Sequence, residues 1–392
     1  MKKILFTLVI LLNAVFALAG NETIKITGGP YVMCADANPV IVWTTNKPAL
    51  SWVEISGDTD EHFYAKERQK FFNSPLGKKR IGKLHQITIP NLERGKKYQY
   101  RIFSQEVLER KNIVTLYGTV ASSAVYRAKP LEFTLPQKDT KSITFSVVND
   151  IHNNSDRLEK LLKFIDEKSE FLVLNGDMVS EMRSEKEVLD GFLTATAKAT
   201  SGKGIPIFYA RGNHETRGEF SEEFMNYFPT TTGKPYFSFT AGSVFFIFLD
   251  SGEDKPDNDI EYFGTADYDK YREDQAKWLK NVLESPECKA AKTRIVITHI
   301  PPSWGSWHGS IHFRKQFMHL LNGTKIDAII SAHLHKHKLY PASESGFNMP
   351  NIANSNMELM NITVDENNIN IKFVSVEGKE AFPELNIPVS KK

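Results

Sequence analysis

The stretch IDAIISAHLHKH, residues 326–337, joins an apolar run to three histidines at alternate positions, His333, His335 and His337. The apolar part has the composition of a short buried strand, and the histidines follow directly after it. If the segment stays extended, the three imidazoles lie on one face. Imidazoles this close repel one another when protonated, so a bound cation explains them better than a solvated, histidine-rich loop.

Four other apolar runs between residues 143 and 299 also end in polar side chains. They are ITFSVV (143–148) before Asp150 and His152, FLVLN (171–175) before Asp177, IPIFYA (205–210) before Arg211, Asn213, His214 and Glu215, and RIVIT (294–298) before His299. Helical patterns near 155–168, 185–200, 269–284 and 311–322 alternate with these runs, which predicts a largely parallel α/β sheet. Because ligands bind beyond the carboxyl ends of parallel strands, we expect these side chains at one edge of one sheet.

The side chains at these strand ends are carboxylates, an amide and imidazoles. Two neighbouring divalent ions need a ligand that bridges them, and a carboxylate with two oxygens can do so. Mixed nitrogen and oxygen donors suit manganese, iron or zinc, whereas magnesium and calcium favour oxygen alone. Each motif by itself has a structural explanation: Asp-x-His pairs cap helices, Gly-Asp forms turns, and a lone His299 fits a core. Their joint occurrence at five strand ends favours a site for two divalent transition-metal ions.

The series DIH, GD, GNHE, TH and AHLH, in this order over residues 141–345, resembles the calcineurin-like metallophosphoesterase superfamily. The resemblance implies a four-layer α/β/β/α fold in which two packed sheets carry a two-metal site at their edge. The implied ligands are Asp150, His152, Asp177 and His335 for one metal, and Asp177 as the bridge, Asn213, His299 and His333 for the other. It further implies that His214 faces the leaving group, as general acid or transition-state stabiliser, and that Glu215 orients His214.

The N-terminal residues follow a different pattern, of short strands separated by turns. The runs PVIVWTT (39–45), SWVEIS (51–56), HQITIP (85–90) and KYQYRIFS (97–104) are rich in β-branched and aromatic residues. This spacing predicts an antiparallel sandwich of the fibronectin type III or immunoglobulin kind over residues 22–136, followed by the α/β part over 141–392. Leu92, Gly95 and Tyr98 fall where such sandwiches place a tyrosine corner.

A β-rich region ahead of this α/β part resembles the arrangement of purple acid phosphatases, with two departures. Ser180 stands three residues after Asp177, where purple phosphatases carry a tyrosine, and those enzymes lack a histidine at the position of His152. Without a tyrosinate there is no reason to expect a ferric, purple site. Ala332, in place of the glycine of many relatives, leaves the ligands untouched, and His337 has no role in the motif.

Several residues near the motifs are candidates for contacting substrate. Arg211 and Arg217 flank GNHE and could hold phosphate oxygens, although a structural ion pair is the stronger alternative for each. Trp304, Trp307 and His308 lie in the loop PPSWGSWHGS (301–310) and could line the substrate pocket, with packing as the alternative. The long polar insert 252–274 is expected to form a rim or lid over the site.

The first nineteen residues have the pattern of an export signal. Lys2 and Lys3 precede an apolar stretch from Ile4 to Phe16 and the small-x-small site Ala17-Leu18-Ala19. This stretch is short for a membrane span, so we expect a periplasmic or secreted protein without a stable membrane anchor. Its removal takes away two lysines and no acidic residue, so the formal charge falls from +2 to zero, which gives no electrostatic signal for nucleic acid.

Two cysteines, Cys34 and Cys288, are too few for a disulfide scaffold. The sequence does not decide whether a single disulfide joins them.

The leading hypothesis is an exported two-metal phosphoesterase in which a metal-bound hydroxide attacks a small phosphate ester and His214 assists departure of the alkoxide. Phosphomonoesters are slightly preferred as substrates. A phosphodiesterase or nucleotide hydrolase with the same metals is the alternative, and a clear basic or aromatic platform would have favoured it. A non-catalytic binding module and a metallohydrolase acting on other bonds are less favoured, because all seven expected ligands and His214 are present.

Overall fold

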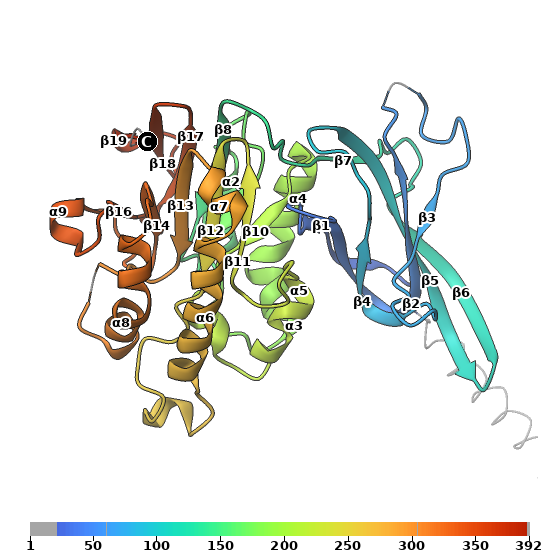
Figure 1. Cartoon of the computed structure of the whole chain (residues 1–392). Coiled ribbons are helices and arrows are strands. Elements are labelled where there is room, and N and C mark those ends of the chain that lie inside the picture. The colour runs from blue at the N-terminus through green and yellow to red at the C-terminus, as the bar shows by residue number, and fades with distance from the viewer. Residues whose placement is uncertain (1–21, 60, 304, 390–392) are drawn as a thin grey trace, which may run out of the picture.

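The computed structural model describes residues 22–59, 61–303 and 305–389, which form three β-sheets and the helices that cover two of them (Figure 1). The expected export signal at 1–19 lies outside these residues. Within the described ranges, no helix combines the length and the apolar character needed to cross a membrane.

The described residues up to Thr134 contain strands and turns but no helix, and the strands pair antiparallel throughout. The strands are β1 (Ile26–Met33), β2 (Val40–Ser56), β3 (Lys70–Phe71), β4 (Ile81–Thr88), β5 (Lys97–Lys111), β6 (Val114–Ser122) and β7 (Leu131–Thr134). The runs expected as two strands at 39–45 and 51–56 are one long strand, because β2 continues through a register shift between Thr44 and Ala49. Before the shift β2 lies between β1 and β4, and after it β2 pairs mainly with β5 and β3.

The turn before β5 contains the hydrogen bond expected of a tyrosine corner. The hydroxyl of Tyr98 accepts a hydrogen bond from the backbone N–H of Glu93 at 2.8 Å. This bond fixes the chain as it enters β5, whose first residues pair with β7.

From residue 143 on, the chain forms two six-stranded sheets, so the single sheet expected from the alternation of strands and helices is wrong. The first has the order β10-β9-β8-β17-β18-β19 and the second has the order β11-β12-β13-β14-β16-β15. The first contains β8 (Ile143–Val148), β9 (Leu172–Leu174), β10 (Ile207–Tyr209), β17 (Glu358–Val364), β18 (Asn368–Ser375) and β19 (Glu380–Pro388). The second contains β11 (Phe237–Ala241), β12 (Val244–Leu249), β13 (Thr293–Thr298), β14 (Ala328–Ser331), β15 (Lys338–Tyr340) and β16 (Asn351–Ala353). The strands that lead to the expected site are parallel within each sheet.

Alternate residues of the central strands face two different layers. In β8, Val147 packs in the core between the sheets, whereas Val148 packs in the cluster that contains residues of α2 and α4. In β12, Phe246 faces the core between the sheets and Ile247 faces the helices on the far side. The rings of Phe145 and Phe246 meet across the two sheets with centroids 5.2 Å apart. This arrangement confirms the four-layer α/β/β/α fold implied by the family resemblance.

The helices cover the outer faces of the two sheets (Figure 1). Those beside the first sheet are α2 (Ser155–Leu162), α3 (Glu185–Val188), α4 (Thr194–Lys203) and α5 (Phe224–Tyr227). Those beside the second are α6 (Tyr268–Leu283), α7 (Pro286–Ala290) and α8 (His308–Asn322), and α9 (Ala342–Ser345) follows β15.

The N-terminal strands pack directly against the α/β part. The hydroxyl of Tyr31 in β1 donates to the carbonyl of Tyr227 at 2.8 Å, and the guanidinium of Arg94 donates to the carbonyl of Thr240 at 3.3 Å. One apolar cluster contains side chains of the N-terminal strands together with those between the two later sheets. Cys34 and Cys288 are both buried and free, so no cross-link joins the two regions.

A buried histidine in β4 makes the stability of the fold depend on pH. The Nε2 atom of His85 lies 2.9 Å from Oγ1 of Thr45, and burial lowers the pKa of His85 from 6.5 to about 4. As the pH falls from 6.5 to 4, the unfolded chain takes up a proton that the folded protein does not, so the fold loses up to about 3 kcal/mol. The stability cost of His85→Gln is therefore expected to be about 3 kcal/mol smaller at pH 4 than at pH 7, as measured by denaturant unfolding. His62→Gln, at an exposed histidine, is the control; equal costs of His85→Gln at both pH values would contradict this expectation.

Candidate metal centre

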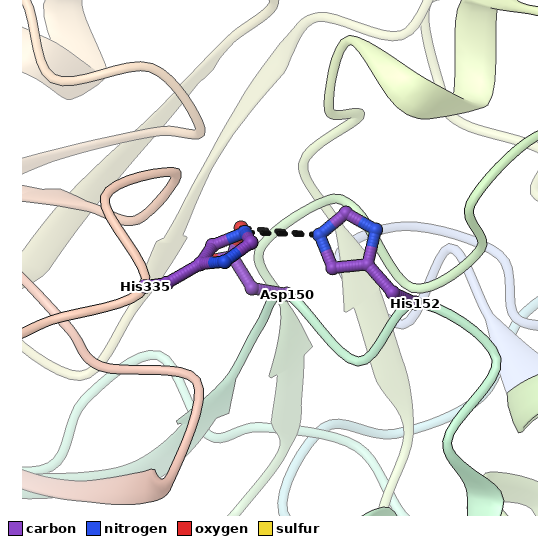
Figure 2. Close-up of side chains that lie close together, drawn as sticks. All are labelled: Asp150, His152 and His335. Atoms are coloured by element: carbon purple, nitrogen blue, oxygen red, sulfur yellow. Dashed lines mark hydrogen bonds and ion pairs between the residues drawn. The ribbon is translucent and has the colours of Figure 1, made fainter.

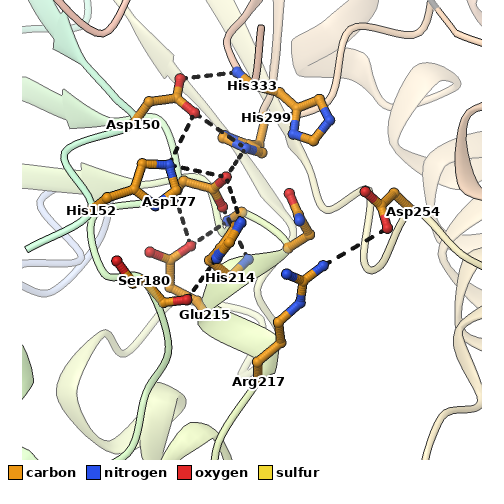
Figure 3. A network of polar contacts seen from close by, with 12 residues as sticks. Asp150, His152, Asp177, Ser180, His214, Glu215, Arg217, Asp254, His299 and His333 are labelled. Atoms are coloured by element: carbon orange, nitrogen blue, oxygen red, sulfur yellow. Dashed lines mark hydrogen bonds and ion pairs between the residues drawn. The ribbon is translucent and has the colours of Figure 1, made fainter. Parts of the chain in front are cut away.

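The polar residues that follow β8, β9, β10, β13 and β14 come together at one end of the two sheets (Figure 3). Five of them have left-handed backbone conformations: Asp150 (φ 52°), His152 (φ 49°), Asp177 (φ 53°), His333 (φ 68°) and His335 (φ 54°). Such a conformation costs a residue other than glycine about 1–3 kcal/mol, and it clusters where function requires a particular geometry.

The histidines after β14 reach the cluster by a route that alternation does not predict. Residues 332–337 leave the sheet in a series of bends, so the expectation of an extended segment with three imidazoles on one face is wrong. The left-handed turns at His333 and His335 bring both side chains to the cluster instead. His337 packs elsewhere, with its ring stacked on Phe382 at a centroid distance of 3.8 Å.

Asp150, His152 and His335 form the first group of possible ligands (Figure 2). The Nε2 atoms of His152 and His335 are 3.0 Å apart, and Nε2 of His335 lies 3.4 Å from Oδ1 of Asp150. The other oxygen of Asp150 is held by the side-chain amide of Asn149 at 2.7 Å and the backbone N–H of His333 at 3.0 Å. Oδ1 of Asp150 is therefore the oxygen presented to the two imidazoles.

Asp177, His299 and His333 form the second group. Nδ1 of His299 donates to the carbonyl of Asn175 at 2.7 Å, which leaves Nε2 facing Oδ2 of Asp177 at 2.9 Å. The same oxygen of Asp177 lies 4.0 Å from Nε2 of His152, which belongs to the first group. Gly176 permits the close approach of His299, because a Cβ atom at Gly176 would lie 2.4 Å from Nδ1 of His299. Asp177 thus stands between the two groups.

The donor set fits divalent transition-metal ions. Oδ1 of Asp150 and Oδ1 of Asn213 are buried without a hydrogen-bond partner among the described residues. Burial lowers the pKa of His333 to about 4, so this imidazole is neutral and able to donate its lone pair. Burial alone would raise the pKa of Asp177, but His299 outweighs it and holds that pKa below its usual range. A buried carboxylate and an amide oxygen without partners, beside neutral imidazole, are the mixed oxygen and nitrogen donors that Mn, Fe or Zn ions accept.

Glu215 holds the backbone around Asp177 rather than orienting His214. Its buried carboxylate accepts hydrogen bonds from the backbone N–H groups of Asp177 at 2.9 Å, Met178 at 2.7 Å and Gly212 at 2.8 Å, and from the hydroxyl of Tyr209 at 2.8 Å. Between the described side chains of Glu215 and His214 there is no hydrogen bond. The expected role of Glu215 toward His214 is therefore corrected: it fixes the turn that carries Asp177.

Replacing Glu215 tests this role. Glu215→Gln puts an NH2 group where one carboxylate oxygen accepts N–H donors, so we expect a loss of about 1–3 kcal/mol in unfolding free energy. Because the turn that carries Asp177 loosens, metal affinity should fall about 10–100-fold. Thermal unfolding and metal titration would measure the two effects, with Glu222→Gln at an exposed position as the control. A variant with wild-type metal affinity would contradict the assigned role.

His214 is oriented by a backbone carbonyl that the sequence motif does not reveal. Nδ1 of His214 donates to the carbonyl of Ser180 at 2.6 Å, and its backbone N–H donates to Oδ1 of Asp177 at 3.0 Å. A contact with a backbone carbonyl does not depend on residue type, so the sequence does not reveal it.

Asn354 is a residue near the site that the sequence motifs do not include. It follows β16, and its side-chain amide donates to Oδ1 of Asn149 at 2.8 Å, so a search for polar residues after every strand would have found it.

The candidate substrate residues have other partners in the structure. Arg211 pairs with Asp250 through Nε at 2.9 Å and Nη2 at 2.7 Å, and Arg217 binds Glu253 through Nε at 2.6 Å and Nη2 at 2.9 Å. Both arginines thus have the ion pair that was the stronger alternative to a phosphate contact. Nε2 of His308 lies 2.8 Å from the carboxylate of Asp269.

Of the two tryptophans in the 301–310 loop, the structure describes only Trp307. Trp307 is exposed, at 47%, directly before α8, and Trp304 lies outside the described residues.

The insert 252–274 contacts the segment that directly follows GNHE. Glu253 accepts hydrogen bonds from the hydroxyls of Thr216 at 2.9 Å and Tyr262 at 3.0 Å, in addition to its contacts with Arg217 (Figure 3 shows Arg217 reaching toward the neighbouring Asp254). A cavity of about 500 Å³ lies between this segment and the insert.

The ion pair between Arg211 and Asp250 is expected to stabilise the fold. Asp250 is fully buried and also accepts a hydrogen bond from the hydroxyl of Tyr271 at 2.7 Å. Asp250→Asn leaves the charge of Arg211 buried without its counterion, so we expect a loss of about 3–5 kcal/mol in the free energy of unfolding. Asp274→Asn, which removes an exposed carboxylate, should cost less than about 1 kcal/mol. Denaturant unfolding compares the two, and equal small costs would speak against a structural role for the pair.

Comparison with known proteins shows which family this chain resembles. Residues 143–337 match the model of the calcineurin-like phosphoesterases. Serine/threonine-protein phosphatase CPPED1 of Mus musculus is 28% identical over 180 residues, which are 43% of this chain and 54% of that protein. The Homo sapiens protein of the same name is 30% identical over 140 residues, 34% of this chain and 40% of its own length. The match thus spans about half the length of these curated relatives or less.

Two solved structures share the fold over most of the chain. A purple acid phosphatase from yellow lupin (Lupinus luteus) seeds aligns with a TM-score of 0.64 and 13% identity, covering 92% of this chain and 74% of that one. PhoD aligns with a TM-score of 0.56 and 13% identity, covering 94% of this chain and 92% of that one. Through residues 143–337, this chain belongs to the calcineurin-like phosphoesterase family, a family of metal-dependent phosphoric ester hydrolases.

Proposed function

We propose that this protein hydrolyses small phosphate monoesters with two divalent transition-metal ions, Mn, Fe or Zn. The residues that would hold them are Asp150, His152, Asp177 and His335 for one ion, and Asp177, Asn213, His299 and His333 for the other. The observation that carries the proposal is the position of the buried Asp177 carboxylate, 2.9 Å from His299 of one ligand group and 4.0 Å from His152 of the other. A carboxylate in this position can bridge two ions.

The residues of the chain divide the work of the reaction. Bound metal ions would lower the pKa of a water molecule and neutralise charge on the phosphoryl oxygens. Asn149 and Asn175 keep Asp150 and His299 in the orientation that ligands require. His214 donates through Nδ1 to Ser180, so its Nε2 is the nitrogen that can carry a proton to the leaving oxygen as the P–O bond breaks.

Preference for monoesters is supported by the kinds of protein that this chain resembles. The curated relatives are named as protein phosphatases and one similar structure is a purple acid phosphatase. A phosphodiesterase or nucleotide hydrolase with the same metals is the alternative, because the two differ only in the groups that meet the second ester substituent.

Parallel assays on an aryl phosphate monoester and the matching diester test the proposal. The metal-reconstituted chain should cleave the monoester with a kcat/KM at least about tenfold higher, a difference of about 1.4 kcal/mol in transition-state free energy. A preference for the diester would establish the alternative. A chain that holds two metal ions and cleaves neither ester would refute the proposed activity on simple phosphate esters.

We also propose that the protein is exported after removal of residues 1–19. The mass of the protein recovered from the periplasm or medium of an expressing bacterium tests export. A mass that includes residues 1–19 would contradict the signal assignment.

We further propose that the protein consists of a fibronectin type III-like or immunoglobulin-like sandwich over 22–136 and a phosphoesterase domain over 141–392. The change of neighbours along β2 supports two layers in the N-terminal region, since its two halves pair with different strands.

A further inference from the structure

A groove that is distant in sequence from the metal-ligand motifs is lined in part by positively charged residues. It has a volume of about 500 Å³ and runs along β4, because consecutive residues from Arg80 to Ile87 line it. Asn226 of α5 also lines it, and Figure 1 shows β4 on the side of the N-terminal strands that faces α5. A hydrogen bond from the side chain of Gln86 to the carbonyl of Asn226 joins β4 to α5.

The groove differs in charge from other cavities of its size. Four others, of about 500 to 580 Å³, each have at least one Asp or Glu in their lining. This groove has Arg80 and Lys83 and no carboxylate. Neither cation forms an ion pair with a carboxylate within the described ranges. The groove is therefore a site of uncompensated positive charge, which favours an anion.

The sequence around the groove adds to its charge. Arg80 and Lys83 belong to GKKRIGK (77–83), which contains four basic residues and no acidic one. Lys78 and Lys79 are exposed beside the groove, and the Nζ atom of Lys79 lies 3.4 Å from the centroid of the Phe72 ring. None of these residues has a part in the phosphoesterase motifs.

The uncharged part of the lining indicates the kind of anion. Asn73, Gln86 and Asn226 supply amides that can bond to hydroxyl groups. Phe, Tyr and Trp are absent from the described lining, so the groove lacks the stacking surface on which nucleic-acid bases are bound. The volume suits a ligand of one or a few sugar units.

We propose that this groove binds an acidic oligosaccharide, with sulfate or phosphate groups against Arg80 and Lys83 and sugar hydroxyls against the amides of Asn73, Gln86 and Asn226. The β4 edge is available for such a ligand, because among the described strands β4 pairs only with β2. The site is separate from the metal centre and would hold an anionic glycan while the α/β part acts on its own substrate.

Calorimetric titration of the full mature chain tests the proposal, with a sulfated hexasaccharide, a phosphorylated mannose oligosaccharide and an unsulfated hexasaccharide as probes. At least one acidic sugar should bind, and the neutral one should not. Arg80→Glu combined with Lys83→Glu should weaken binding about tenfold or more, because two charged contacts are reversed. The matched control, Lys280→Glu with Lys372→Glu, changes the net charge equally at exposed positions and should bind as the wild type does.

Comparison of the two acidic probes distinguishes sulfate from phosphate as the preferred group. The proposal is overturned if neither acidic sugar binds at physiological salt, or if both double variants lose affinity equally. It is also overturned if single-stranded DNA binds the groove more tightly than either sugar. Hydrolysis of an aryl phosphate should be unchanged in both double variants, which shows that each is folded.

Discussion

Asp177→Asn is expected to abolish ester hydrolysis and to remove bound metal. Oδ1 of Asp177 accepts the backbone N–H of His214, and Oδ2 faces both ligand groups. An amide whose oxygen keeps the bond to His214 turns its NH2 group toward both metal positions, and an NH2 group cannot bridge two ions. Because Asp177 lies between the two ligand groups, both metal positions should be affected. The loss of kcat/KM should exceed about 100-fold, the upper range for removing a residue that only supports a ligand.

The fold of this variant should remain. The backbone N–H of Asp177 keeps its bond to Glu215, and asparagine has nearly the same size as aspartate. Circular dichroism checks the fold, and Asp274→Asn controls for the loss of a carboxylate. A folded Asp177→Asn protein with full metal content and full activity would exclude Asp177 as the bridging ligand.

His214→Gln is expected to lower kcat about 10²–10⁴-fold while metal content stays at the wild-type level. The imidazole is held by the Ser180 carbonyl through Nδ1, so Nε2 can deliver a proton to the leaving oxygen, whereas glutamine cannot act as an acid at this position. The loss should be greatest for alkyl phosphates, whose leaving groups need a proton, and smaller for nitrophenyl phosphate.

Steady-state kinetics on the two ester types measures this difference, with the exposed His319→Gln as the control. If metal content falls together with kcat, His214 acts as a ligand rather than as an acid. If the loss is the same for both leaving groups, His214 stabilises charge without transferring a proton.

The position of the site follows from the sequence because strand direction determines where side chains meet. β8, β9 and β10 are parallel to one another, as are β13 and β14, so the residues after each strand necessarily lie at the same end of their sheet. Each of these strands is short and wholly buried, and its end is visible as the change from apolar to polar residues. The residues of the candidate centre could therefore be named before their geometry was known.

The number of sheets and the shape of the loops could not be predicted in the same way. Strands of the two sheets alternate with helices in one continuous pattern, and only tertiary packing separates them. The left-handed turns at His333 and His335 depend on contacts such as the hydrogen bond from the His333 N–H to Asp150, which is 183 residues earlier in the chain. The role of Glu215 likewise depends on backbone donors, which have no signal in residue type.

Metal content per chain, measured by plasma mass spectrometry after reconstitution with Mn, Fe or Zn, decides whether the chain has a two-metal centre. Seven ligands that share one bridging carboxylate should hold about two ions per chain. We expect about two ions per chain in the wild type and a sharp fall in Asp177→Asn. A folded wild-type chain that holds no metal ion under any of these conditions would exclude a two-metal centre.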